Sequence, residues 1–193
     1  DETRIYVEDG LVVRYEERQG ALTKSIDHLR AVPVVVPAGS ASADTHRDQL
    51  GRRHLPQMKL IVLDENPPAG GSSPPSARSL SADGNAPAHI LTCTRSNLGA
   101  TLSKISSACD AVLFWDRSGS VDDGSLVELL ASLTLAPYVG AVKGPGAFLL
   151  RPQLAGPVAD IFLTENWEER MGQRVESWGY KVLALGRCCC NPP

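Results

Sequence analysis

Three ionisable residues each follow a short apolar run, and this placement is the main chemical signal of the sequence. Asp64, Arg95 and Asp116 are the residues concerned. A carboxylate can accept hydrogen bonds from a nucleobase or a ribose, and it can bind a divalent cation through oxygen. A guanidinium can hold a phosphate through two parallel hydrogen bonds. Together the three residues indicate a site for an anionic nucleotide or a nucleotide-sugar.

The apolar runs that precede these residues are predicted to be strands. Val32–Pro37 and Lys59–Leu63 do not alternate between apolar and polar residues, which is typical of strands buried on both faces. Further strands are expected at 88–94, 111–115, 139–143, 147–151 and 180–185, and helices at 22–29, 44–55, 100–108, 125–133 and 166–178. The repeated alternation of strand and helix predicts the α/β class with a largely parallel central sheet.

The ends of the first four of these strands are expected to converge. They carry the segments Pro37-Ala-Gly-Ser, Asp64-Glu-Asn, Arg95-Ser-Asn and Asp116-Arg-Ser. Ligands of such sheets bind beyond the carboxyl ends of the strands, so the four segments should line one crevice. The alternative is that Asp64 and Asp116 only end their strands, because aspartate is a common turn residue.

The N-terminal segment is predicted to be a β-hairpin. Residues Arg4–Tyr15 alternate in polarity around Asp9-Gly10, a pair that tolerates the positive φ angles of a tight turn. An uncovered edge of this hairpin could pair with a second copy and make a homodimer. The predicted domains are residues 1–31 (hairpin and short helix), 32–186 (the α/β domain) and 187–193 (a tail).

Composition excludes several classes of protein. Lys and Arg total 19 against 22 for Asp and Glu, which argues against a nucleic-acid partner. No run approaches 18 apolar residues, so no membrane span is expected. The cysteines, Cys93, Cys109 and Cys188–Cys190, show no zinc spacing and favour reduced thiols in a cytoplasmic protein. The sequence contains neither a dinucleotide fingerprint nor a P-loop nor a nucleophile elbow.

The order of the motifs resembles the family 2 glycosyltransferases, whose domain has the Rossmann-like nucleotide-diphospho-sugar transferase fold. The resemblance covers about residues 32 to 186. It is carried by Val34-Val-Val-Pro-Ala, Ile61-Val-Leu-Asp-Glu-Asn, the R-x-N-x-G of Arg95–Gly99, Val112-Leu-Phe-Trp-Asp-Arg-Ser in the DxD position, Gly146–Arg151, and Phe162-Leu-Thr-Glu-Asn-Trp-Glu.

The resemblance implies a glycosyltransferase that moves a sugar from a nucleotide-diphospho-sugar to an acceptor hydroxyl, with inversion expected. The implied donor site consists of Pro37, Ala38, Asp64, Arg95, Asn97, Gly99 and Asp116. Asp64 would hold the base, Arg95 the phosphate side, and Asp116 the ribose or a metal ion. Glu165 is the candidate catalytic base, with Glu168 as its substitute.

Two departures from the family pattern affect these expectations. Ser118 replaces the second DxD carboxylate, so dependence on Mg²⁺ or Mn²⁺ at Asp116 is expected to be weak or absent. A basic side chain such as Arg117 or Lys143 could then neutralise the diphosphate. Asn166 stands where the family has a carboxylate, which leaves a transferase-like binding protein without activity as an alternative. A nucleotidyltransferase on a related fold is a further alternative.

Overall fold

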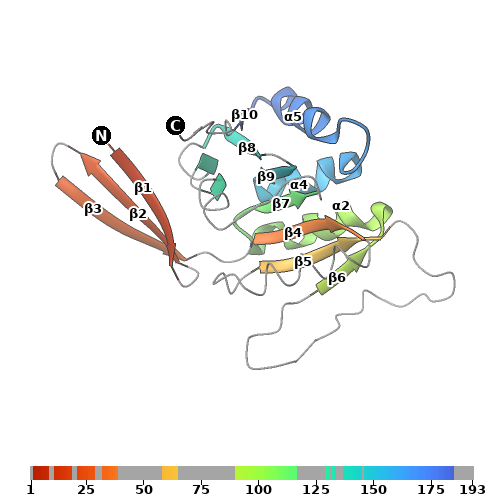
Figure 1. Ribbon diagram of the computed structural model, residues 1–193, viewed down its shortest axis with the longest axis horizontal. Coiled ribbons are helices and arrows are strands. Elements are labelled where there is room, and N and C mark those ends of the chain that lie inside the picture. Colours follow the sequence, from red (N-terminus) through yellow and green to blue (C-terminus); the bar gives the residue numbers. More distant parts are fainter. Residues whose placement is uncertain are drawn as a thin grey trace, which may run out of the picture.

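The computed structural model describes residues 2–8, 11–18, 21–28, 32–38, 58–64, 90–116, 129–130, 132–133, 137–144 and 146–184. These residues form a three-stranded sheet and a seven-stranded sheet (Figure 1). The expected helix at 44–55 and the tail at 187–193 lie outside the described residues. No helix in the described ranges is long and apolar enough to cross a membrane.

The N-terminal segment is a three-stranded antiparallel sheet, seen in Figure 1 as the red strands at the left. β1 (Glu2–Glu8) pairs with β2 (Leu11–Arg18), as expected for the hairpin. The predicted helix at 22–29 is wrong, because Ala21–His28 is strand β3 and pairs with β2 along its whole length. Only Gln19 and Gly20 separate β2 from β3, and so short a connection favours an antiparallel neighbour.

The seven-stranded sheet carries the strands predicted for the α/β domain. They are β4 (Val32–Pro37), β5 (Met58–Leu63), β6 (Ile90–Cys93), β7 (Val112–Trp115), β8 (Val139–Gly144), β9 (Ala147–Leu150) and β10 (Lys181–Ala184). Their order is β10-β8-β9-β7-β4-β5-β6. Every neighbouring pair is parallel except the two that include β9. The sheet is therefore mixed, because two residues between β8 and β9 cannot make the crossover that parallel strands need.

The described helices differ from the prediction at two places. Helix α2 (Arg95–Ile105) begins five residues before the expected start at Ala100 and continues into η1 (Ser106–Ala108). Helix α4 (Pro152–Val158), followed by η2 (Ala159–Ile161), was not predicted, because Pro152, Gly156 and Pro157 suggest a loop. Proline at the first helical position is favourable, since its missing N–H needs no partner there.

The last long helix agrees closely with the prediction. Helix α5 (Trp167–Ser177) is followed by Gly179 at φ +86°, the left-handed conformation that favours glycine after a helix. Of the helix expected at 125–133, residues 129–130 and 132–133 are described and are helical.

The core lies on both faces of the large sheet. Val34 and Val36 pack in one cluster with Leu129 and Leu133. Val35, between them, packs in a second cluster that includes residues of α2, α4 and α5. Successive strand residues point to opposite faces, so a run that is apolar at every position is buried on both sides. The reasoning that identified these strands from the sequence is confirmed for β4.

Candidate functional site

The carboxyl ends of β4, β5 and β6 are level with one another. The Ala38 N–H donates to the Leu63 carbonyl at 2.8 Å, and the Asp64 N–H donates to the Cys93 carbonyl at 2.8 Å. Each hydrogen bond joins the residue after one strand to the last residue of the next. Ala38, Asp64 and Thr94 therefore follow one another along the same edge of the sheet.

Asp116 continues this edge on the other side of β4. Val35 of β4 pairs with Phe114 of β7, and Asp116 stands two residues beyond Phe114. The Asp116 N–H donates to the Gly146 carbonyl at 2.9 Å, which fixes the backbone where β7 ends. Asp64 and Asp116 thus follow the two strands that flank β4, as expected for converging strand ends.

The carboxyl ends of the neighbouring strands β4 and β7 form a topological switch point. From β4 the chain proceeds through β5 to β6 in one direction, and β7 lies on the opposite side of β4. The order β6-β5-β4-β7 is the 3-2-1-4 order of doubly wound sheets, in which ligands bind where the direction of winding reverses. Pro37, Ala38 and Asp116 lie at this point.

The R-x-N-x-G residues begin helix α2, and two of them make structural contacts. One Arg95 nitrogen (Nη1) donates to the carbonyls of Asp160 and Phe162, at 3.0 and 2.7 Å. A Cβ added at Gly99 would lie 3.0 Å from the Gly156 carbonyl, so glycine permits close packing of α2 on α4. Asn97 is exposed. Their roles in nucleotide binding stay predictions, and the motif also has a structural explanation.

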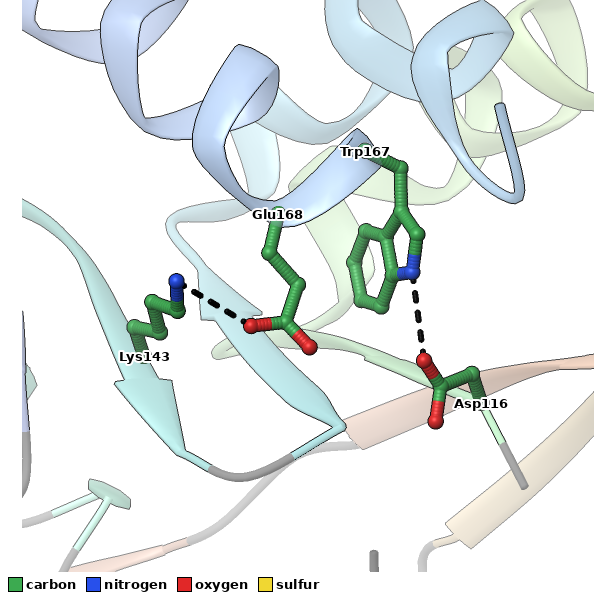
Figure 2. A network of polar contacts seen from close by, with 4 residues as sticks. All are labelled: Asp116, Lys143, Trp167 and Glu168. Atoms are coloured by element: carbon green, nitrogen blue, oxygen red, sulfur yellow. Dashed lines mark hydrogen bonds and ion pairs between the residues drawn. The ribbon is translucent and has the colours of Figure 1, made fainter. Parts of the chain in front are cut away.

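An aromatic cluster positions Trp167 beside Asp116. The ring of Phe162 lies edge-to-face against Phe114 and Trp167, with centroids 5.1 and 5.0 Å away. Phe148 lies 6.4 Å from Trp167 in a similar geometry. The indole N–H (Nε1) donates to Asp116 Oδ2 at 3.1 Å, while the side chain is only 8% exposed (Figure 2). One Asp116 oxygen is thereby held in a fixed direction.

The next residue of α5 makes a second polar contact with the sheet. Lys143 Nζ of β8 lies 3.2 Å from Glu168 Oε2, and the two side chains are 40% and 22% exposed (Figure 2). Lys143 pairs with Phe148 of β9, and Phe148 pairs with Phe114 of β7. Directly paired residues point to the same face, as do residues two apart on one strand. Lys143 and Asp116 therefore lie on the face that α5 covers.

Glu165 lies on the turn that precedes α5, and its side chain is exposed. Leu163 and Asn166 on either side have φ of 63° and 52°. The Thr164 hydroxyl donates to the Ile161 carbonyl at 2.7 Å and accepts from Arg170 Nη1 at 2.9 Å, which closes the turn. Asparagine adopts the left-handed conformation more readily than most residues, which is a structural reason for Asn166.

The sequence interpretation missed two members of this arrangement. It gave no role to Trp167, and it treated Lys143 without its partner Glu168. An aromatic residue directly before Glu168-Glu169 at a helix start was the available signal. Its partner Asp116 is 51 positions away, and nothing in the sequence indicates that pairing.

No group of three or more His, Cys, Asp or Glu side chains within the described ranges is placed to hold a metal ion. The proposed ligand Asp116 already accepts the Trp167 N–H through Oδ2. Arg117, Ser118, Asp122 and Asp123 lie outside the described residues. Weak or absent metal dependence at Asp116 stays a prediction, because Mg²⁺ is often held by one or two carboxylates together with waters and substrate phosphates.

Comparisons with known proteins found structural likeness without a family match. No family model matches the chain, and no curated protein matches it. A solved structure from Desulfovibrio desulfuricans G20, provisionally named a nucleotide-diphospho-sugar transferase, has a TM-score of 0.47 and 12% sequence identity. The likeness covers 80% of this chain and 79% of that one. A likeness at this TM-score and identity carries no conclusion about function.

Proposed function

We propose that the chain binds a nucleotide at the carboxyl edge of the sheet and transfers a sugar from a nucleotide-diphospho-sugar to an acceptor hydroxyl, with inversion. One observation carries the proposal: Asp64 and Asp116 follow the two strands that flank β4, beside the switch point. Doubly wound sheets bind nucleotides at such points, and carboxylates are suitable acceptors for base and ribose hydrogen bonds.

The donor roles follow the order of residues along the edge. Asp64, beside the end of β6, would accept hydrogen bonds from the base. Pro37 and Ala38 lie between the two aspartates, where the backbone can approach the nucleoside. Asp116 would accept a hydrogen bond from the ribose, and the indole N–H of Trp167 orients its carboxylate through Oδ2.

Glu168 is better placed than Glu165 to act as the base. It belongs to the first turn of α5, beside Trp167, and that residue contacts Asp116. In the proposed step a Glu168 oxygen takes the proton of the acceptor hydroxyl while the hydroxyl oxygen bonds to the anomeric carbon. The bond from that carbon to the diphosphate breaks, and its electron pair leaves with the nucleoside diphosphate. Glu165 stays a second candidate, one turn earlier in the chain.

Replacing Asp64 with alanine tests the binding part of the proposal. Loss of a hydrogen bond to a charged group should weaken nucleoside diphosphate binding by roughly 1.5–3 kcal/mol, or about ten- to a hundredfold. Isothermal titration with UDP, GDP and TDP measures this effect. Asp110→Ala is the matched control, because it removes the same charge before β7, at the opposite edge of the sheet. Equal affinity in folded Asp64→Ala and the native protein would exclude Asp64 from the site.

A nucleotide-binding protein without transferase activity is the second candidate. It is favoured by the contacts of the α5 turn, where Asp116 and Glu168 already have protein partners. This candidate predicts nucleotide binding with no turnover of any nucleotide-sugar. An assay of donor hydrolysis, with water as the acceptor, distinguishes the two candidates. Chromatography measures the nucleoside diphosphate that an enzyme would release.

A further inference from the structure

The diphosphate of the proposed donor needs a positive partner, and most described arginines near the site are engaged. Arg95 binds two carbonyls of the η2 turn. Arg151 donates to the carbonyls of Val139 and Leu133, at 2.6 and 2.9 Å. Arg170 donates to the Thr164 hydroxyl. The described residues also offer no cluster of metal ligands. A cationic side chain that can leave its protein partner would stabilise the leaving group.

Lys143 has the position and the exposure for this role. Its strand β8 is parallel to β7, so the carboxyl ends of both strands lie at the same edge of the sheet. The pairing of Lys143 with Phe148, and of Phe148 with Phe114, places the lysine on the Asp116 face. Its side chain is 40% exposed, so solvent and a ligand can reach the ammonium group.

The Lys143–Glu168 ion pair can be broken at little cost. Both groups are partly exposed, and exposed ion pairs contribute little net stability because water solvates the separated charges. A diphosphate carries more negative charge than one carboxylate. It should therefore compete successfully for the ammonium group when the donor binds.

We propose that Lys143 is a diphosphate-binding residue that exchanges partners. Without donor it pairs with Glu168, and with donor it binds the diphosphate oxygens and releases the Glu168 carboxylate. Release leaves Glu168 free to take the acceptor proton only when a donor is present, which couples donor binding to base availability. This inference rests on the proposed function.

A purely structural role for the ion pair makes a different prediction. In that case the pair only holds the first turn of α5 against β8. Lys143→Met and Glu168→Gln remove the same ion pair, so both substitutions should then change nucleotide affinity in the same direction. Partner exchange predicts opposite directions, because one substitution removes the binding group and the other removes its competitor.

The experiment is titration calorimetry of UDP, GDP and TDP in EDTA, alongside uridine, guanosine and thymidine. Lys143→Met should lower the affinity for the nucleoside diphosphate that the native protein binds by about ten- to a hundredfold. Its affinity for the matching nucleoside should stay the same. Glu168→Gln should raise the affinity for the diphosphate by up to about fivefold, because the free energy of an exposed ion pair no longer opposes binding. Lys143→Arg keeps the charge and should bind within about tenfold of the native protein. Lys181→Met, on exposed β10, is the matched control and should change nothing.

Each outcome decides between the two proposals. If the native protein binds a nucleoside diphosphate and Lys143→Met binds it equally well, the lysine role is wrong and the proposed function survives. The lysine role is also wrong, with the proposed function intact, if Lys143→Met and Glu168→Gln both weaken diphosphate binding. It is wrong as well if the native protein binds the diphosphate only with added Mn²⁺. If no nucleoside diphosphate binds the native protein under any of these conditions, the proposed function itself fails. Far-ultraviolet circular dichroism of each variant confirms that it is folded.

Discussion

Trp167 shows how one buried residue can both pack the core and orient a polar group. Its ring packs against Phe148 and Phe162, while its N–H reaches the Asp116 carboxylate. Burying the indole ring stabilises the fold, and the indole N–H needs a hydrogen-bond acceptor once it leaves water. The Asp116 carboxylate is that acceptor, so the hydrogen bond also fixes its direction at the sheet edge. The side chain proposed to hold the ribose is therefore oriented by the core beneath it.

Three neighbouring glutamates allow the base to be identified. Glu168→Gln should reduce the rate of sugar transfer by about 10²–10⁴-fold, because the amide keeps the shape of the side chain and loses its basicity. Glu165→Gln and Glu169→Gln should react within about threefold of the native rate. Glu169 is an exposed residue of the same helix turn and serves as the control. Single-turnover kinetics at saturating donor measure the rates. A large loss in Glu165→Gln with a normal Glu168→Gln would transfer the role to Glu165.

The position of α5 depends on a glycine in the strand beneath it. A Cβ at Gly140 of β8 would lie 2.6 Å from the Tyr180 Cβ and 2.8 Å from the Val175 Cγ1. Glycine therefore lets α5 and the start of β10 approach β8 closely. The site depends on this packing, because the first turn of the same helix carries Trp167 and Glu168.

Two glycine substitutions with the same added methyl group should have opposite effects. Gly140→Ala forces atoms too close together and should lower the free energy of unfolding by about 1–3 kcal/mol. Gly172→Ala, inside α5 with nothing within 4 Å of the new Cβ, should raise it by about 0.5–1 kcal/mol through helix propensity. Urea denaturation measures both free energies. Equal effects at the two positions would contradict the close packing at Gly140.

At the scale of the whole molecule, the N-terminal sheet and the seven-stranded sheet are separate hydrogen-bonded units. The predicted domain boundary at residue 31 lies between β3 and β4. We expect the larger sheet to fold without the smaller one, because it has its own core on both faces. A three-stranded sheet alone is close to the limit of independent stability.

Deleting residues 1–31 should therefore leave the rest of the chain folded. The free energy of unfolding should fall by no more than about 1 kcal/mol, or about 2–4 °C in Tm. Truncation after Gly179 is the contrasting variant. It removes β10 and with it Tyr180 and Val182, which pack against the core, so it should destabilise the protein more. Calorimetry measures both. A loss of cooperative unfolding in the N-terminal deletion would show that the two sheets are one unit.

The sequence by itself determined the strands of the large sheet and the polar residues that follow them. A strand such as Val34–Val36 is apolar at every position, so all of its side chains leave water only when both faces of the strand are buried. Gly179 likewise marked the end of α5, because few other residues adopt a positive φ without strain. These signals are local, so they could be recognised along the chain.

Tertiary structure decided the rest. Ala21–His28 became a strand because β2 offered it a free edge, and β9 ran antiparallel because its connection to β8 was short. Trp167 contacts Asp116, and Glu168 contacts Lys143. Each contact joins segments that are distant in the sequence, so residue spacing does not predict it. Such contacts depend on which strands become neighbours and on which face each side chain points to. The order of strands in the sheet brings them together.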